Sequence, residues 1–131
     1  MTTSLYAAIL VIILIVLSAK VIGARRSAGA SLNDGNDDKL KRRIRAHGNF
    51  VEYTPIFLLT LLITELQGLE GVYLNLFGSL FVIGRTLHAY GIVESETKNK
   101  NFLYRQSGMF CTFFCLGSLA LILLIQFLLS D

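Results

Sequence analysis

Arg45, Asn49 and Glu52 place charged and hydrogen-bonding groups inside a stretch that is otherwise apolar. Residues 46–64 form a run of 19 residues in which Glu52 is the only formal charge. A carboxylate within a helix of membrane-crossing length is costly in lipid, so it suggests a functional site and requires a partner. At about 100° per residue, the three side chains share one helix face, within roughly 60° of one another. This face offers the Arg45 guanidinium as a hydrogen-bond donor, the Asn49 amide as both donor and acceptor, and the Glu52 carboxylate as an acceptor.

A second charge within the membrane, Arg85, is expected at a similar depth on the following helix. Glu52 lies seven residues after Arg45, roughly 10 Å of helix, and Arg85 lies eight residues before the end of its span at Val93, roughly 12 Å. We expect Glu52 and Arg85 to pair or to flank one polar ligand; a purely structural ion pair is the alternative. The further polar groups near this level exceed what one ion pair needs and favour a ligand: Asn49, Tyr53, His88 and Tyr90.

Four apolar helices must position these side chains. The chain has 131 residues, of which 53% are hydrophobic and 16% charged, and the charged residues are clustered. Its long apolar stretches can cross a bilayer, and in lipid they must be helical. We expect helices over about residues 4–24, 38–66, 71–94 and 103–129, in one domain that covers residues 1–131. The predicted fold class is therefore an all-α, integral membrane four-helix bundle.

The second expected helix has a defined start and an internal proline. Asp37 or Asp38 can cap it, which gives a helix of about 29 residues and about 43 Å. Pro55, the only proline in the chain, cannot donate to the Val51 carbonyl and should kink the helix. His47 is rotated away from the polar face, so we expect it to point toward another surface.

The basic residues are confined to two connections. All 12 Lys and Arg lie between Lys20 and Arg45 or between Arg85 and Arg105. Positive charge near membrane spans stays in the cytoplasm, so we expect a multi-pass protein with both basic connections on that side. The net charge of +3 then reflects orientation and contact with membrane lipids, and we expect no nucleic-acid binding.

Cys111 and Cys115 lie one helical turn apart on the fourth expected helix. Two thiols without nearby histidine or carboxylate ligands make a poor metal site. We therefore predict no metal site here and expect both cysteines to pack as small apolar groups.

These motifs resemble those of the MAPEG family, the membrane-associated proteins of eicosanoid and glutathione metabolism, with the greatest likeness to short bacterial members. The resemblance covers the whole chain. The residues that carry it are Arg25-Arg26, the Arg45-x-x-x-Asn49-x-x-Glu52-Tyr53-x-Pro55 run, Gly84-Arg85-x-x-His88-x-Tyr90-Gly91, and Arg105. It implies a homotrimer, in this case in a bacterial inner membrane, with glutathione bound between neighbouring subunits toward the cytoplasmic side.

Glutathione carries two carboxylates, an ammonium and a thiol, and the polar residues offer partners for these groups. Arg45 and Arg85 suit the two carboxylates because guanidinium groups bind carboxylates in a fork. Asn49 suits a backbone amide of the tripeptide, and Glu52 suits its ammonium. The sequence thus contains complementary groups for a ligand with charges of both signs.

The resemblance adds further site residues. It implies that Arg25 reaches into the neighbouring subunit's site and that Tyr53 contributes a hydroxyl contact, and we include His88 and Tyr90 among the glutathione-binding residues. Arg105 matches the catalytic arginine of the family, whose charge favours thiolate over thiol; anchoring at lipid headgroups is the alternative for Arg105. Several family members have a tyrosine where this chain has His88. We therefore expect the part of the site that faces the second substrate to differ from that of those members.

The sequence therefore predicts a membrane-bound glutathione transferase, in which glutathione is a co-substrate and lipophilic electrophiles enter from the bilayer. Glutathione peroxidase activity toward lipid hydroperoxides is a further option at the same site. Two alternatives stay open: a non-enzymatic lipid-binding or scaffolding member of the family, and a small transporter or channel that uses Glu52 and Arg85 as a relay.

Overall fold

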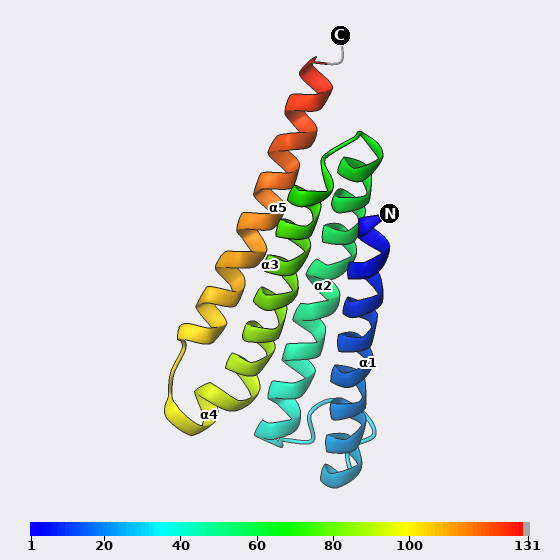
Figure 1. The fold of residues 1–131 in the computed structure, drawn as a ribbon. Helices are drawn as coiled ribbons and strands as arrows, with labels where there is room; N and C mark the ends of the chain where they lie inside the picture. Colours follow the sequence, from blue (N-terminus) through cyan, green and yellow to red (C-terminus); the bar gives the residue numbers. More distant parts are fainter. Residues whose placement is uncertain (130–131) are drawn as a thin grey trace.

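The computed structural model describes residues 1–129, which form helices joined by short connections (Figure 1). The helices are α1 (Thr2–Ala28), α2 (Asp38–Leu66), α3 (Gly71–Tyr90), the π-helix η1 (Gly91–Ser95), α4 (Glu96–Asn99) and α5 (Leu103–Leu129). Because η1 and α4 continue α3, the helices together make four rods. Each rod is long and apolar enough to cross a membrane. The predicted all-α fold, with four helices able to span a membrane, is confirmed.

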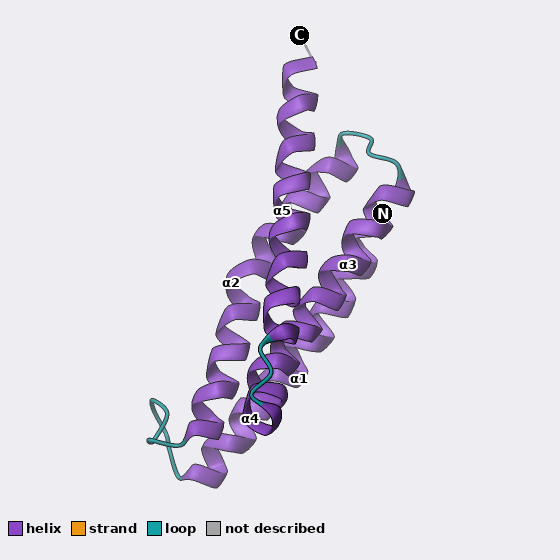
Figure 2. Ribbon diagram, turned by 90° about the vertical axis from the view of Figure 1, so that its left-hand side faces the viewer, coloured by secondary structure: helices purple, strands orange, loops and turns teal. Residues whose placement is uncertain are grey.

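The four rods run alongside one another and alternate in direction (Figures 1 and 2). α1 packs mainly on α2, and α3 packs mainly on α5. The start of α1 and the end of α5 lie at the end of the bundle that carries the α2–α3 connection, and α4 and the α1–α2 connection lie at the other end. The two basic connections are therefore together at one end.

The helix boundaries follow local signals in the sequence. α2 begins where expected because Asp37 is its N-cap, with Oδ1 accepting a bond from the Leu40 N–H at 2.7 Å. It continues as a helix through Pro55. α1 is longer than the predicted 4–24 and ends at Ala28, because the next residue, Gly29, has a left-handed conformation (φ 64°) that closes the last turn.

The prediction that the third helix ends near residue 94 was wrong. Helical structure continues through η1 to Asn99. Although the apolar stretch ends at Val93, Glu94 and Lys98 form an ion pair of 2.8 Å one turn apart, which supports a further turn beyond that stretch. This extension carries Glu96 toward the start of α5.

A cluster of buried apolar side chains joins all four rods. Phe57 of α2 and Phe81 of α3 stack with their ring centroids 3.7 Å apart, and both are fully buried. Cys115 of α5 lies in the same cluster, with Sγ 3.6 Å from the Phe77 carbonyl oxygen. Cys115 therefore packs as a small apolar side chain, as predicted.

Glu65 secures the opposite end of the bundle. Its carboxylate accepts hydrogen bonds from the backbone N–H groups of Thr2 and Thr3, the latter at 2.9 Å. These are free N–H groups of the first turn of α1, where the helix dipole favours a negative charge. The contact fixes the start of α1 against the end of α2.

Glycines allow α3 and α5 to approach at backbone distance. A Cβ atom at Gly108 would lie 2.5 Å from the Gly84 carbonyl oxygen and 2.6 Å from the backbone nitrogen of His88. A Cβ atom at Gly91 would lie 2.6 Å from the Arg105 nitrogen. Small residues permit such close packing of membrane helices. The close approach brings the end of α3 against the first turns of α5.

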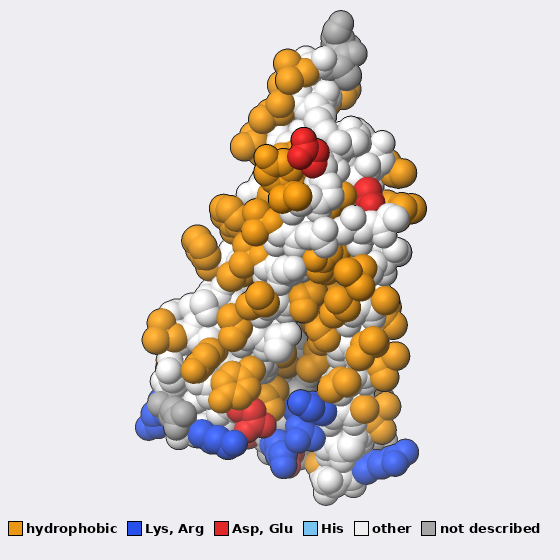
Figure 3. Space-filling model, viewed as in Figure 1, with side chains coloured by type: hydrophobic (Ala, Val, Ile, Leu, Met, Phe, Trp, Pro, Cys, Tyr) orange, Lys and Arg blue, Asp and Glu red, His pale blue; other side chains and the backbone are white. Residues whose placement is uncertain are grey.

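The outer surface is apolar over most of its length, and the Lys and Arg side chains gather at the end that carries α4 (Figure 3). Large apolar side chains such as Ile12, Phe110 and Leu124 are more than half exposed in the single chain. Lipid tails or neighbouring subunits can cover such side chains in a membrane. The charge distribution of the folded chain is thus strongly one-sided.

We expect Gly108→Ala to destabilise the protein by about 1–3 kcal/mol, because the added methyl group meets backbone atoms that cannot move independently. Gly117→Ala is the matched control on α5, since a Cβ atom there meets no atom within 4 Å. Thermal unfolding in detergent measures both. Equal stability of the two variants would contradict the backbone contact between α3 and α5.

Candidate functional site

A cleft of about 560 Å³ opens at the basic end of the bundle, between α2, η1, α4 and the start of α5. Arg45 and Arg105, two of the predicted site residues, both line it. Its lining residues are Asp38, Lys41, Arg42, Ile44, Arg45, Gly48, Ile92, Glu96 and Arg105. Four cations and two carboxylates thus surround one opening, which suits a ligand with more negative than positive charge.

Glu96 connects two arginines across this cleft. Arg42 of α2 donates to Glu96 Oε2 at 3.2 Å, and Arg105 of α5 donates to Oε1 at 3.3 Å. The Glu96 side chain is only 6% exposed. The same Arg42 group also donates to the Ile92 carbonyl of η1 at 3.2 Å. These contacts hold Arg105 at the cleft and tie α2 and α5 to the extension of α3.

Arg42 and Glu96 were missed in the sequence analysis. The run Lys41–Arg45 contains four cations, and its sequence gives no reason to select Arg42. Glu96 lies in a charged stretch that was expected to follow the third helix. The only available signal was the presence of a carboxylate close in sequence to Arg105.

Arg45 and Glu52 share an exposed face of α2, whereas Asn49, which was predicted to lie on the same face, is buried. Arg45 Nη1 lies 3.4 Å from Glu52 Oε1, and the two side chains are 60% and 52% exposed. The predicted alternative in which Glu52 pairs directly with Arg85 was wrong. Glu52 points outward from α2, whereas Arg85 is buried between the helices, so the similar depth of the two charges does not bring them together.

Arg85 is 1% exposed and is the largest fully buried side chain. Its Nη1 donates to Asn49 Oδ1 at 2.9 Å and to the Asn49 carbonyl at 3.4 Å. Its guanidinium carbon lies 5.5 Å from the centre of the Tyr53 ring. Within residues 1–129, Arg85 forms no ion pair, and its Nε has no hydrogen-bond partner. An amide, a carbonyl and an aromatic face therefore compensate this buried cation.

These contacts orient two other predicted site residues. Asn49 is itself buried and does not line the basic cleft, and its Oδ1 is occupied by Arg85. The Tyr53 ring lies between Arg85 and Phe113, whose ring it meets edge to face at a centroid distance of 5.7 Å. Arg85 thus supports Asn49 and Tyr53 from inside the bundle.

His88 and Arg105 are in contact through the backbone of Arg105. The buried His88 ring has Nδ1 3.1 Å from the Arg105 carbonyl oxygen. His88 therefore fixes the first turn of α5, and it does not line the basic cleft. The Arg105 side chain, in contrast, remains almost half exposed. His88 and Arg105 are therefore in contact, but only Arg105 lines the cleft, while His88 supports its backbone.

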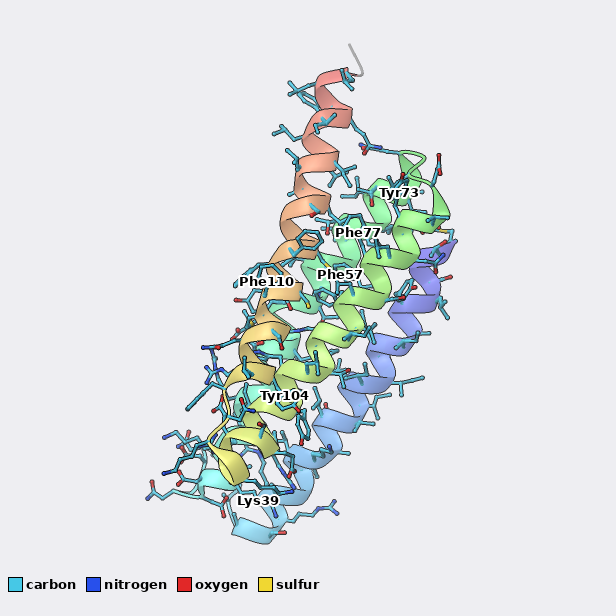
Figure 4. The ribbon with its side chains drawn as sticks, turned by 60° about the vertical axis from the view of Figure 1, so that its left-hand side comes forward. Lys39, Phe57, Tyr73, Phe77, Tyr104 and Phe110 are labelled. Carbon is cyan, nitrogen blue, oxygen red and sulfur yellow. The ribbon has the colours of Figure 1, made fainter. Side chains whose placement is uncertain are left out.

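Tyr90 and Arg25 lie outside the basic cleft. Tyr90 packs edge to face on Tyr104 with a centroid distance of 5.3 Å, and it lines a separate groove between α1 and α3. Figure 4 shows Tyr104 near the start of α5, nearer the basic end than Phe110. Arg25 donates to the Asn33 carbonyl at 2.8 Å. The single chain thus brings neither residue to Arg45 and Arg105.

Arg25 is nevertheless close to the wall of the basic cleft. It lines a surface pocket of about 610 Å³ together with Lys41 and Ile44, and these two residues also line the cleft. His47, in contrast, points toward α1, with Nε2 3.0 Å from Ser18 Oγ. His47 therefore faces another surface, as predicted from its rotation on α2.

We expect the Arg85–Asn49 contact to stabilise the fold by about 1.5–3 kcal/mol, the usual range for a hydrogen bond to a charged group. A double-mutant cycle with Arg85→Met and Asn49→Leu isolates this contact. Each single variant strands a buried polar group, so the two destabilisations should sum to more than that of the double variant. Additive losses in thermal unfolding would show that the contact contributes no coupling energy.

Comparisons with known proteins identify the family of this chain. The MAPEG family profile matches residues 3–125. The inner membrane protein YecN of Escherichia coli strain K12 is 33% identical over 112 residues, which is 86% of this chain and 82% of YecN. YecN of E. coli O6:H1 strain CFT073 shows the same identity and coverage. The match extends over all four membrane helices and the whole basic end, and the chain therefore belongs to the MAPEG family.

Proposed function

We propose that this protein is a membrane-bound glutathione transferase that conjugates glutathione to lipophilic electrophiles, with reduction of lipid hydroperoxides as a second activity. The observation that carries this proposal is that Arg45 and Arg105 line one basic cleft while Arg45 also pairs with Glu52. Membership of the MAPEG family supports it, because the family includes glutathione transferases. The related YecN is an inner membrane protein, and we propose the same location here.

The arrangement of charges suits glutathione. The cations of the cleft can bind its two carboxylates, and the exposed Glu52 carboxylate can accept its ammonium. The Asn49 NH₂ group and the Tyr53 hydroxyl supply neutral contacts. Arg85 and His88 act as positioning residues, since both are buried and hold Asn49 and the Arg105 backbone.

The assembly is part of this proposal. Arg45 and Glu52 lie on an exposed face of α2, so a neighbouring subunit can cover them. In the proposed homotrimer, Arg25 of that neighbour completes the glutathione site. The proximity of Arg25 to Lys41 and Ile44 supports this assignment, because a subunit packed over the cleft wall also meets the end of α1.

Catalysis would consist of thiol activation and the approach of two substrates. The Arg105 guanidinium stabilises the thiolate, and the thiol proton leaves to solvent. The sulfur lone pair then forms a C–S bond with the electrophilic carbon while the leaving group departs with its bonding electrons. The apolar helices supply the lipophilic substrate from the bilayer, so proximity provides much of the rate enhancement.

Arg105→Ala tests thiol activation. If the charge lowers the pKa of bound glutathione by about 2 units, its loss should reduce the thiolate fraction near neutral pH many-fold, equivalent to about 2.7 kcal/mol. Turnover with an aryl halide should fall similarly and recover as the pH rises. The ultraviolet absorbance of the thiolate, followed across pH after adding glutathione, measures the effect.

Arg26→Ala is the control for this experiment, because it removes an exposed cation from the same end without changing the cleft lining. The His88 contact to Arg105 uses the backbone carbonyl, so Arg105→Ala should still fold. Equal thiolate signals and equal turnover in wild type and Arg105→Ala would remove Arg105 from the mechanism. A wild type without any thiolate signal would favour a lipid-binding role.

The proposed site also requires a cytoplasmic basic end. We expect a cysteine at Gly71 to react with a membrane-impermeant maleimide from outside intact spheroplasts, and a cysteine at Lys100 to react only after lysis, because basic connections remain inside. Gly71 begins α3 at the end opposite to α4. Labelling of Lys100→Cys alone in intact spheroplasts would reverse the topology and move the cleft away from cytoplasmic glutathione.

A further inference from the structure

A second cavity, of about 310 Å³, lies between α1, α2 and α3 and shares no lining residue with the basic cleft. Its walls are largely apolar, with Ile12, Ile13 and Val16 from α1, Ala89 from α3 and Val93 from η1. Ile12 and Val16 are exposed in the single chain, so the groove is open on its α1 side. An apolar groove along two membrane helices has the shape and chemistry to accept a lipid chain.

One end of this groove carries cations. Lys20 and Arg43 line it at the basic end of the bundle, and Arg43 Nη1 donates to the Lys20 carbonyl at 3.0 Å. This bond fixes the Arg43 side chain beside the groove. Arg43 Nε is buried and has no hydrogen-bond partner within residues 1–129. The Lys20 ammonium is not involved in any ion pair of the described residues.

The groove continues into a polar pocket. Arg43, Val93 and Glu94 line both the apolar groove and an adjoining pocket of about 520 Å³. The remaining residues of that pocket are polar: Asp38, Lys39, Arg42, Thr97 and Lys98. Four cations and two carboxylates line the pocket, and Glu94 is already paired with Lys98 at 2.8 Å. The amphipathic cavity therefore has an excess of positive charge at its polar end.

We propose that this cavity is a binding site for one anionic phospholipid of the cytoplasmic leaflet. One acyl chain lies in the apolar groove, and the phosphate lies between Lys20 and Arg43, with the headgroup in the polar pocket. An anionic lipid fits better than a zwitterionic one because Lys20, Lys39 and Arg43 form no ion pair with any described residue, so positive charge exceeds negative charge here. The apolar groove shares no lining residue with the proposed glutathione cleft, whereas Asp38 and Arg42 line both the cleft and the polar pocket. The proposal does not depend on the function of the cleft.

Tryptophan fluorescence can test this site directly, because the chain contains no tryptophan. Val16→Trp places a single fluorophore at the groove, and Phe110→Trp places one on the exposed surface of α5. Each variant is reconstituted in phosphatidylcholine vesicles that contain dibrominated phosphatidylglycerol or dibrominated phosphatidylcholine as quencher. We expect phosphatidylglycerol to quench Val16→Trp at about fivefold lower mole fraction, the scale of one added charge contact, and to show no preference at Phe110→Trp.

Lys20→Gln with Arg43→Gln should abolish this preference at Val16→Trp. Arg26→Gln with Lys100→Gln removes the same charge from the same end but leaves the groove lining intact, so the preference should remain. Native mass spectrometry of the tryptophan-free chain provides a second measurement: retained phosphatidylglycerol should decrease with the first pair of substitutions only. Three results would overturn the proposal. Both lipids could quench Val16→Trp equally, both charge variants could lose the phosphatidylglycerol preference equally, or neither lipid could reach the groove because a second copy of the chain covers it.

Discussion

The Arg85 guanidinium is buried between membrane helices and is held by Asn49 and Tyr53 without a carboxylate partner among residues 1–129. A cation in such a place must keep its hydrogen bonds, because no water replaces them in the bilayer. This requirement fixes α2 relative to α3. It also leaves Glu52 free to face outward, where it pairs with Arg45.

The close approach of α3 and α5 determines where Arg105 lies. Backbone contact at Gly84 and Gly108 brings the end of α3 against the start of α5. His88 then reaches the Arg105 carbonyl, and Glu96, on the helical extension of α3, reaches its guanidinium. The position of Arg105 thus depends on helix packing at several points along the α3–α5 interface.

Two of the cavities at the basic end differ in chemistry. The cleft around Arg45 and Arg105 is polar and opens toward the α2 and α5 side, whereas the groove beside Lys20 and Arg43 has apolar walls from α1 and α3. Both use cations of the same two connections. A one-sided charge distribution can therefore serve both membrane orientation and the binding of more than one anionic molecule.

The sequence by itself determined the four membrane helices, the grouping of cations at one end and the shared face of Arg45 and Glu52. These features depend on apolar length, on charge position and on the rotation of one helix, which are local properties. Only the tertiary structure decided that Arg85 bonds to Asn49, that His88 holds the Arg105 backbone, that Tyr90 faces the other groove and that Glu96 joins Arg42 to Arg105. These contacts depend on how one helix is rotated and displaced relative to another, because groups at equal depth can point in different directions.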